Sequence, residues 1–424
     1  QDPDTLDTWF SAGMFSFTPL GGVDEETDDL KAYHPTSVLE TGYDILTFWV
    51  VRMIMMTTYM RGEIPFETVY LHGLVRDDQG RKMSKSLDNI IDPLDVSKKF
   101  GTDAVRLSLI IGASPGNDSK LSEEKIGGFR NFANKLWNIS RFMLMNIDEP
   151  KISVKKPEAK TLADRWILEE LENIKYKVKN GFDIYNFSFA GEQLRDFTWN
   201  ELADWYLEIS KIEGDKSEIL NYVLNTILKL WHPFMPFVTE AIWQEVYDEE
   251  NLLMVEKWPE TKDSTVYTND SVNLSDIKNI ITGIRSLKSD YKIDPVKKLK
   301  VVISAGNKKG MLEENVAVIK GLARLENLQI EETVEKPEGH VGFVEGGAEV
   351  FVDLTGIVDF EKEKKRLQDE INSLQKYTKG LEGKLSNKSF VDNAPEEVIV
   401  KEKEKLEESK TKLEKLEGQV SNLN

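Results

Sequence analysis

The 424-residue sequence contains no cysteine, only four histidines and no long apolar run. Without cysteine the chain can form neither a disulfide framework nor a thiolate zinc site, and the histidines are too scattered to indicate a metal centre. The most apolar stretch, residues 45–56, is interrupted by Arg52 and is too short to span a bilayer, and no segment resembles a signal peptide. We therefore expect a cytoplasmic protein with no membrane partner and no protein-bound metal.

Positive charge is also scarce relative to negative charge. The 55 lysines and arginines face 74 aspartates and glutamates, and the net charge of −19 argues against broad, nonspecific binding of nucleic acids but allows local basic surfaces. Hydrophobic residues make up 40% of the chain, enough at this length to fill the cores of roughly two to four domains. Because the first residue is glutamine rather than methionine, we interpret the chain as part of a longer protein.

The most informative segment is residues 80–86, Gly-Arg-Lys-Met-Ser-Lys-Ser, which we call the cationic loop. An apolar run at 69–75 predicts a buried strand before it, and Asp92 with Pro93 predicts a helix start after it. Two lysines on a mobile loop can close over a polyphosphate and stabilise the negative charge that develops as pyrophosphate leaves. The alternative is a solvated basic turn, which is the usual explanation for a Lys-x-x-Lys pattern.

A second nucleotide-binding element is indicated upstream. Residues 33–42 predict a strand that ends in Gly42, and a helix is predicted to begin at residue 43, an order in which doubly wound α/β folds bind nucleotides. Asp44 could accept hydrogen bonds from ribose hydroxyls or could be an ordinary helix-start carboxylate. Ile45 and Trp49 are four residues apart and would share one helical face as an apolar wall. Trp9 lies in an aromatic segment that suits either a pocket or a core.

The remaining chain changes its apolar period twice. Residues 162–247 have apolar residues at helical spacing, which predicts an antiparallel helix bundle, with aromatics that serve as core more often than as base-stacking surfaces. Residues 274–355 predict a small α/β domain, with helices at 277–287 and 312–325 and strands at 299–304 and 348–354.

The C-terminal segment carries leucine and isoleucine in alternating steps of four and three. This spacing predicts two arms of an antiparallel coiled coil, with a tip at residues 386–395. Lysines cover both arms and could meet RNA phosphates. Interspersed glutamates make a charge-balanced, solvated surface the alternative.

Several of these stretches together resemble the valyl-tRNA synthetases, a family of class I aminoacyl-tRNA synthetases. The resemblance rests on residues 6–11, 35–39, 42–49, 52–56, 72–77 and 91–95 and on the complete second class I signature, Lys82-Met83-Ser84-Lys85-Ser86, in the family's order and spacing. Residues 198–208 and 232–240 are similar to the anticodon-binding bundle of valyl, isoleucyl, leucyl and methionyl enzymes. The tip sequence at 386–391 resembles the tRNA-contacting arm of bacterial-type valyl enzymes.

The resemblance implies a chain of five parts. An α/β partial Rossmann-type catalytic domain is expected at 1–112 and a helical junction with a linker at 113–157. An all-α helical bundle that binds the anticodon is expected at 158–262, a small α/β domain at 270–355, and a C-terminal antiparallel coiled-coil hairpin at 357–424.

The resemblance also implies an activity, that of a valine–tRNA ligase. Such an enzyme uses ATP with Mg²⁺ to convert valine to valyl-adenylate and transfers the valyl group to the 3′ end of tRNA(Val); we identify no protein ligand for Mg²⁺ and expect a monomer. By similarity, Lys82 and Lys85 are catalytic and stabilise the transferring phosphates. The implied ATP-binding residues are Gly42, Asp44, His72, Met83, Ser84 and Lys85, and the implied valine pocket consists of Trp9, Ile45 and Trp49.

The chain departs from the family at the first class I signature. The family carries His-Ile-Gly-His or a variant in an N-terminal half that also holds an editing domain, whereas none of His34, His72, His232 and His340 lies in an H-x-G-H pattern. We therefore predict that this chain, as a C-terminal half, cannot adenylate valine alone. Two alternatives stay open. One is an isoleucyl-tRNA synthetase, which the C-terminal arm disfavours, and the other is a noncatalytic tRNA-binding fragment.

Overall fold

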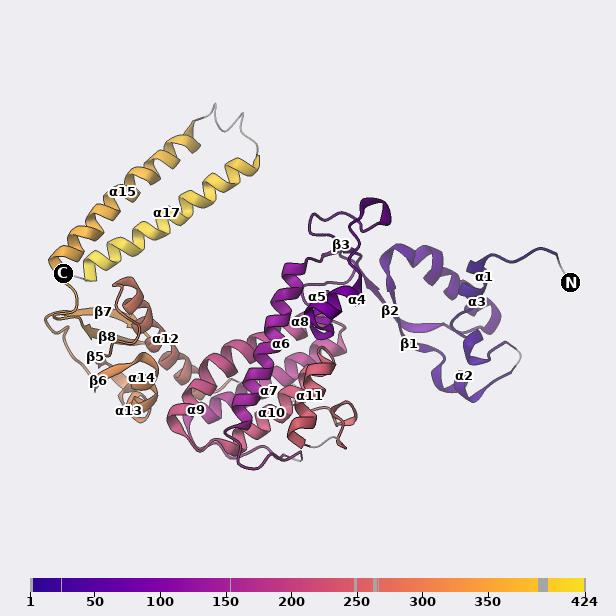
Figure 1. Cartoon of the computed structure of the whole chain (residues 1–424), viewed down its shortest axis with the longest axis horizontal. Helices are drawn as coiled ribbons and strands as arrows, with labels where there is room; N and C mark the ends of the chain where they lie inside the picture. The colour runs from indigo at the N-terminus through magenta and orange to yellow at the C-terminus, as the bar shows by residue number, and fades with distance from the viewer. Residues whose placement is uncertain are drawn as a thin grey trace. The chain divides into compact units, whose positions relative to one another are not determined.

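The computed structural model describes residues 3–23, 25–152, 154–247, 250–261, 265, 267–387 and 396–422. Helices dominate the described chain, and its sheets are small, with two or four strands (Figure 1). The chain divides into two compact units. The first contains Gln1–Leu207 and Asp215–Tyr267, and the second contains Glu208–Gly214 and Thr268–Asn424. No helix in the described ranges is both long enough and apolar enough to cross a lipid bilayer.

The first unit opens with a two-stranded parallel sheet, β1 (Thr36–Gly42) beside β2 (Phe66–His72), so the predicted strand that ends at Gly42 is confirmed. Two short helices, α1 (Thr8–Gly13) and α2 (Asp28–Tyr33), precede this sheet. The prediction of one continuous helix from residue 43 is wrong. The connection consists of a 3₁₀ turn, η2 (Tyr43–Ile45), a π-helical turn, η3 (Leu46–Val50), and the helix α3 (Val51–Arg61).

The C-terminal boundary of the strand predicted at 69–75 is also wrong, because β2 ends at His72. The next residue, Gly73, lies directly against the backbone of Asn117, and a Cβ at this position would be 1.7 Å from the Asn117 carbonyl oxygen. Strand pairing resumes beyond this close approach, where β3 (Val75–Arg76) runs parallel to β4 (Ser119–Lys120). Glycine is therefore required for the chain to leave β2 along this path.

Longer helices form the rest of the first unit. α4 (Pro93–Phe100) starts where the sequence predicted, since Asp92 Oδ1 accepts a hydrogen bond from Leu94 N at 2.8 Å. The helices that follow in this unit are α5 (Thr102–Ile110), α6 (Glu123–Leu144), α7 (Leu162–Asp183), α8 (Phe187–Asp196), the π-helical η5 (Phe197–Tyr206), α10 (Ser217–Trp231) and α11 (Pro236–Tyr247). The short helix α9 (Leu207–Glu213) belongs to the second unit from Glu208 onward. The predicted helices of the bundle are confirmed, and its large aromatics Tyr206, Trp231 and Trp243 are fully buried core residues.

The second unit holds a four-stranded mixed sheet in the order β6-β5-β8-β7. Its elements are α12 (Asn269–Asp290), β5 (Leu299–Ser304), α13 (Lys309–Glu314), α14 (Val316–Ala323), β6 (Leu325–Glu331), β7 (His340–Glu345) and β8 (Ala348–Asp353) (Figure 1). Two of these strands were predicted, but the edge strands β6 and β7 were not. The predicted helix at 312–325 is wrong at its end, because Arg324 is left-handed, with φ of 53°, and Leu325 begins β6.

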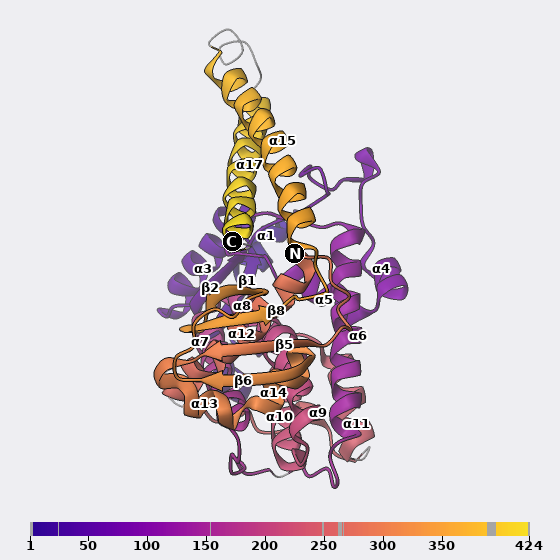
Figure 2. The same cartoon turned by 90° about the vertical axis from the view of Figure 1, so that its left-hand side faces the viewer.

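Two 27-residue helices, α15 (Phe360–Ser386) and α17 (Glu396–Asn422), lie side by side in both views (Figures 1 and 2). Leu367, Ile371 and Leu416 are buried between them, at positions where the apolar spacing predicted contact. Most of the predicted tip, residues 388–395, lies outside the described residues. The coiled-coil geometry of this helix pair stays a prediction.

Candidate functional site

The ends of β1 and β2 bring together three residues predicted to bind a nucleotide. Gly42 and His72 are direct partners in the parallel sheet. A Cβ on Gly42 would lie 2.6 Å from Asp44 Oδ1 and 3.5 Å from His72 Cε1, so any larger residue would displace the aspartate. Gly42 is itself buried and is flanked by the exposed Asp44 carboxylate and the His72 imidazole, so a ligand at this strand end would meet these two side chains.

The His72 ring is oriented by its own neighbourhood. Its Nδ1–H donates to the Gly73 carbonyl oxygen at 2.8 Å, and its Nε2 lies 3.3 Å from Glu40 Oε1. The side chain is 45% exposed. One edge of the imidazole is thus fixed by the backbone, while much of the ring stays accessible at the strand end.

The cationic loop is built on the carboxylate of Asp77, which is only 5% exposed. Oδ1 accepts hydrogen bonds from the backbone N–H groups of Gln79, at 3.1 Å, and Arg81, at 2.7 Å. Oδ2 accepts from Arg81 Nε at 2.8 Å and from Asn89 Nδ2 at 2.9 Å. These donors, Asn89 foremost and then Arg81, lower the pKa of Asp77 to about 2 because they favour the charged carboxylate.

Asn89 connects this carboxylate to the signature residues. Its Oδ1 accepts from Ser84 N at 2.9 Å, and its Nδ2 also donates to the Lys82 carbonyl oxygen at 3.2 Å. Lys82 is exposed and Met83 is half-buried. The backbone of Lys85 begins a 3₁₀ turn, η4 (Lys85–Leu87), and the side chain of this predicted catalytic lysine lies outside the described part of the structure.

Asp118 links the base of the loop to the Gly42 turn. It accepts hydrogen bonds from Leu74 N at 2.8 Å and from Arg76 Nε, and the nearby Tyr43 side chain also lowers its pKa. The Leu74 amide, followed by Arg76, holds the pKa of Asp118 below its usual range. The two predicted nucleotide-binding elements are therefore joined through one carboxylate.

The predicted valine-pocket residues lie around α1, η2 and η3 but have different partners. Trp49 Nε1 donates to the Ala12 carbonyl oxygen at 3.1 Å, whereas Trp9 lies under Arg52, whose guanidinium carbon is 5.3 Å from the ring centroid. Ile45 is half-buried at the end of η2. Because η3 is π-helical, Ile45 and Trp49 are not related by α-helical spacing, and their common wall stays a prediction.

Sequence reasoning missed the residues that hold these elements together. The burial of Asp77 could not be predicted from its sequence neighbours, and neither Asn89 nor Asp118 stands in a local pattern that predicts its hydrogen bonds. Within the described ranges, no group of three or more His, Cys, Asp or Glu residues is placed to hold a metal ion.

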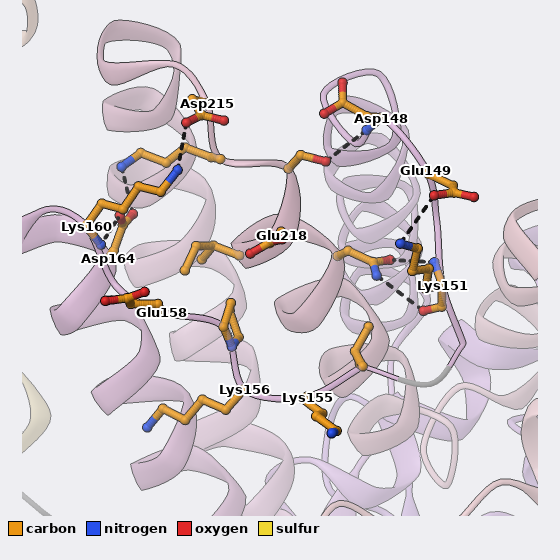
Figure 3. Close-up of a pocket in the computed structure, with 16 residues that line it drawn as sticks. Asp148, Glu149, Lys151, Lys155, Lys156, Glu158, Lys160, Asp164, Asp215 and Glu218 are labelled. Carbon is orange, nitrogen blue, oxygen red and sulfur yellow. Dashed lines mark hydrogen bonds and ion pairs between the residues drawn. The ribbon is translucent and has the colours of Figure 1, made fainter.

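A separate hollow of about 600 Å³ lies in the first unit between residues 148–160 and the start of α10 (Figure 3). Its wall carries lysines and carboxylates in nearly equal numbers, several of them paired: Lys216 with Asp164 at 2.7 Å, Lys160 with Asp215 at 2.8 Å and Lys151 with Glu149 at 3.2 Å. The first pair is buried and ties α7 to the start of α10. No residue of the predicted site is among the described lining, and the paired charges favour a structural role.

Three parts of the chain match known families. Residues 1–122 match the family described as tRNA synthetases class I (I, L, M and V), and residues 164–303 match the anticodon-binding domain of tRNA ligase. Residues 359–424 match the valyl tRNA synthetase tRNA binding arm.

Curated relatives match the chain along nearly its whole length. The valine–tRNA ligase of Petrotoga mobilis is 41% identical over 430 residues, which cover 99% of this chain and 49% of that protein. The valine–tRNA ligase of Geobacter sulfurreducens is also 41% identical, over 96% of this chain and 48% of that protein. The chain thus spans about half the length of the curated relatives it matches.

Among solved structures, the leucyl-tRNA synthetase of Agrobacterium radiobacter K84, in a ternary complex with tRNA and LeuAMS, superposes with a TM-score of 0.53 and 22% identity. The match covers 63% of this chain and 35% of that one. At this identity the similarity is one of fold.

Proposed function

Because the chain belongs to the class I aminoacyl-tRNA synthetases, in their valyl branch, we propose that it forms part of a valine–tRNA ligase. In this reaction the carboxylate of valine attacks the α-phosphorus of ATP and displaces pyrophosphate. A hydroxyl at the 3′ end of tRNA(Val) then takes the valyl group and displaces AMP. The observation that carries the proposal is the cationic loop, linked through Asp118 to the Gly42–His72 strand end, in a chain 41% identical to valine–tRNA ligases.

The roles of the loop residues follow from their charge. Pyrophosphate leaves with added negative charge on its oxygens, and Lys82 and Lys85 would stabilise that charge as the bond to the α-phosphorus breaks. Exposed Lys82 is free to turn toward a phosphate, because the contacts that fix its backbone involve its carbonyl group. The backbone of Met83 and Ser84 would border the nucleotide from the same side.

The strand end suits the remaining parts of ATP. The exposed carboxylate of Asp44, which lies against Gly42, can accept hydrogen bonds from ribose hydroxyls, and the accessible ring of His72 can flank an adenine. Mg²⁺ would accompany the phosphates and supply further charge. The described residues offer no ligand cluster for it, so no step is assigned to it. Trp9, Ile45 and Trp49 are our candidates for the valine pocket.

The RNA-binding parts lie downstream under this proposal. Catalysis belongs to residues 1–112, which a junction at 113–157 joins to an anticodon-binding bundle at 158–262. A small α/β domain at 270–355 precedes a tRNA-binding arm at 357–424. The family matches at 164–303 and 359–424 support the two assignments to tRNA, and the match of the arm favours the valyl over the isoleucyl enzyme.

The catalytic part requires a complementary polypeptide. Ile54, Met55, Tyr59 and Met60 on α3 are exposed, although a helix with apolar residues on several sides is normally buried. Parallel sheets normally have both faces covered, and a sheet of two strands depends on packing against other elements for stability. The segment that covers this surface would correspond to the half of the curated relatives that the chain does not match.

Two measurements test the proposal together. The first is the affinity of the chain for valine, isoleucine and leucine acceptor tRNAs at one fixed salt concentration. The second is valine-dependent exchange of pyrophosphate into ATP, by the chain alone and after addition of the uncovered portion of the Petrotoga mobilis ligase. We expect preference for tRNA(Val), no exchange by the chain alone, and exchange after completion. Preference for another acceptor, or no exchange after completion, would overturn the proposal.

A further inference from the structure

Asp77 and Asn89 stand at the two ends of the segment that contains the cationic loop. The proposed reaction gives neither of them a substrate to contact, yet their side chains are hydrogen-bonded to each other at 2.9 Å. Asp77 is buried in a loop whose other polar residues are mostly exposed. Burial of a carboxylate costs free energy unless hydrogen bonds replace its water, and here four donors do so.

The four donors to Asp77 come from both halves of the loop. Three of them come from Gln79 and Arg81, so the first half is folded around the Asp77 carboxylate. Asn89 carries the connection into the second half, where its amide contacts Ser84 N and the Lys82 carbonyl oxygen. The main chain of Lys82 is also bridged to Arg76. The signature is therefore held by its backbone from both sides.

We propose that Asp77 and Asn89 are positioning residues for the amino-acid activation step, forming a clamp that fixes the backbone of residues 82–84 beneath the phosphates of ATP. The inference rests on the proposed function, because it needs a triphosphate in front of the loop. Neither residue contacts the substrate. Within residues 82–84 the clamp binds main-chain atoms only, which leaves the Lys82 amine available for ligand contacts, while the Ser84 hydroxyl is hydrogen-bonded to the Ser86 hydroxyl at 3.1 Å.

The clamp should act on the transition state more than on ATP binding. Most of the proposed ground-state contacts to the ribose and adenine come from Gly42, Asp44 and His72, which the clamp does not touch, and only the backbone of residues 83 and 84 is shared between the clamp and the nucleotide. The lysine contacts strengthen as pyrophosphate departs, and a group that is already in place requires no reorganisation at that moment. Loss of the clamp should therefore lower kcat and leave the KM for ATP nearly unchanged.

The test uses the chain completed by the uncovered portion of the Petrotoga mobilis ligase. Asn89→Ala removes the hydrogen bonds of the Asn89 side chain to Ser84 N, to the Lys82 carbonyl oxygen and to Asp77. Asn89→Asp keeps an acceptor for Ser84 N but places a second carboxylate against Asp77. The exchanged pair Asp77→Asn with Asn89→Asp restores one amide and one carboxylate. Asp78→Asn is the matched control, since Asp78 is the exposed neighbour of Asp77.

We expect Asn89→Ala to lower kcat for valine-dependent pyrophosphate exchange between about tenfold and a hundredfold, with the KM for ATP changed by less than about threefold. The exchanged pair should recover at least part of the loss seen in Asn89→Asp, and Asp78→Asn should match the wild type. An unchanged kcat in Asn89→Ala, or an increase in KM alone, overturns the inference.

Hydrogen exchange at the Ser84 amide separates this inference from the proposed function. The clamp predicts slow exchange in the wild type and fast exchange in Asn89→Ala, with or without activity. If the completed wild type lacks valine-dependent exchange, the proposed function fails and the positioning role fails with it. Equal hydrogen exchange in the wild type and Asn89→Ala would overturn the clamp itself, whatever the activity.

Discussion

The carboxyl group of Asp77 is surrounded by donors that favour its charged form, and its pKa of about 2 lies below the ordinary value of about 3.9 for aspartate. A folded-state pKa below the unfolded one means that the group stabilises the fold at pH values above about 4. This contribution is lost as pH falls from about 4 toward 2. Protonation of Asp77 should therefore weaken the hydrogen bonds that order the loop at acid pH.

We therefore predict that the titration of Asp77, followed by carbon-detected NMR, has its midpoint near pH 2 in the wild type. Asn89→Ala should raise this midpoint, because Asn89 is the donor with the largest effect on the pKa. The control Asp78→Asn should leave it nearly unchanged. A wild-type midpoint near pH 4, or a midpoint that is the same in Asn89→Ala as in the wild type, would show that these donors do not stabilise the charged carboxylate.

Gly73 offers a second prediction at the scale of one residue. A methyl group at this position would meet the Asn117 carbonyl oxygen at 1.7 Å, so Gly73→Ala must displace the backbone of one of the two segments. We expect a loss of about 1–3 kcal/mol in the free energy of unfolding of this region, the usual cost of overpacking. Urea-dependent hydrogen exchange of peptides from β2 measures it.

Gly128 provides the matched control for that substitution. It lies in α6, and a Cβ built there meets no described heavy atom within 4 Å. Gly128→Ala should therefore stabilise the helix by about 0.5–1 kcal/mol, because alanine loses less backbone entropy on folding. Similar effects of the two substitutions would mean that the contact between Gly73 and Asn117 does not constrain the fold.

At the scale of elements, ion pairs between α15 and α17 reduce the number of lysines that are available to contact RNA phosphates. Lys410 pairs with Glu382 at 2.9 Å, and Lys412 pairs with Glu370 at 3.1 Å, which joins the two helices. These lysines are partly neutralised by the partner helix. Lys376 and Lys379 are exposed on α15 and form no ion pair among the described residues, which makes them better candidates for phosphate contacts.

Reversal of the charge at Lys376 and Lys379 should therefore weaken tRNA binding and flatten its salt dependence. Each lost phosphate contact lowers the slope of log K against log salt by about 1. Fluorescence anisotropy with tRNA(Val) at several salt concentrations measures the slope. The same reversal at exposed Lys155 and Lys156, which lie outside the family matches, is the control. An unchanged slope after reversal at residues 376 and 379 would make this face of the helix pair a solvated spacer.

Sequence reasoning located elements in proportion to how regularly they bury side chains. The central strand β5 buries Leu299, Val301 and Ile303, a strict alternation, and it was predicted to the residue. The edge strand β6 buries only Leu325 and Ile330 of its seven residues, which gives no such period, and it was missed. Long helices with one buried stripe were found for the same reason as β5.

The site followed a similar rule. Gly42 was predictable because a strand end with a glycine is a local pattern, whereas His72 was implied only by the family resemblance; the structure makes the two residues partners. The bond between Asp77 and Asn89 depends on how a loop closes over twelve residues, and no local pattern encodes that closure. Likewise the π-helical η3 could not be distinguished from an α-helix by apolar spacing, so the α-helical spacing predicted for Ile45 and Trp49 was wrong, while their common wall stays a prediction.

At the scale of the whole molecule, exposed apolar side chains are unevenly distributed within the first unit. Residues 46–60 contribute Leu46, Phe48, Val51, Ile54, Met55, Tyr59 and Met60 to the surface. A concentration of this kind marks an interface or a liability to aggregate. The same region holds a parallel sheet of only two strands, so two independent features indicate a missing partner for one part of the molecule.

These features give a prediction about assembly. The chain alone should self-associate as its concentration rises, and the uncovered portion of the Petrotoga mobilis ligase should suppress this by covering α3. Charge introduced by Met55→Lys with Tyr59→Lys, at side chains 66% and 87% exposed, should reduce self-association but also prevent assembly with that portion. The control is Met145→Lys, at a methionine that follows α6 and is 76% exposed. This substitution should change neither self-association nor assembly with that portion. Sedimentation velocity measures both effects. If the double variant assembles as well as the wild type, the partner binds elsewhere on the first unit, and the exposed face of α3 is not its docking surface.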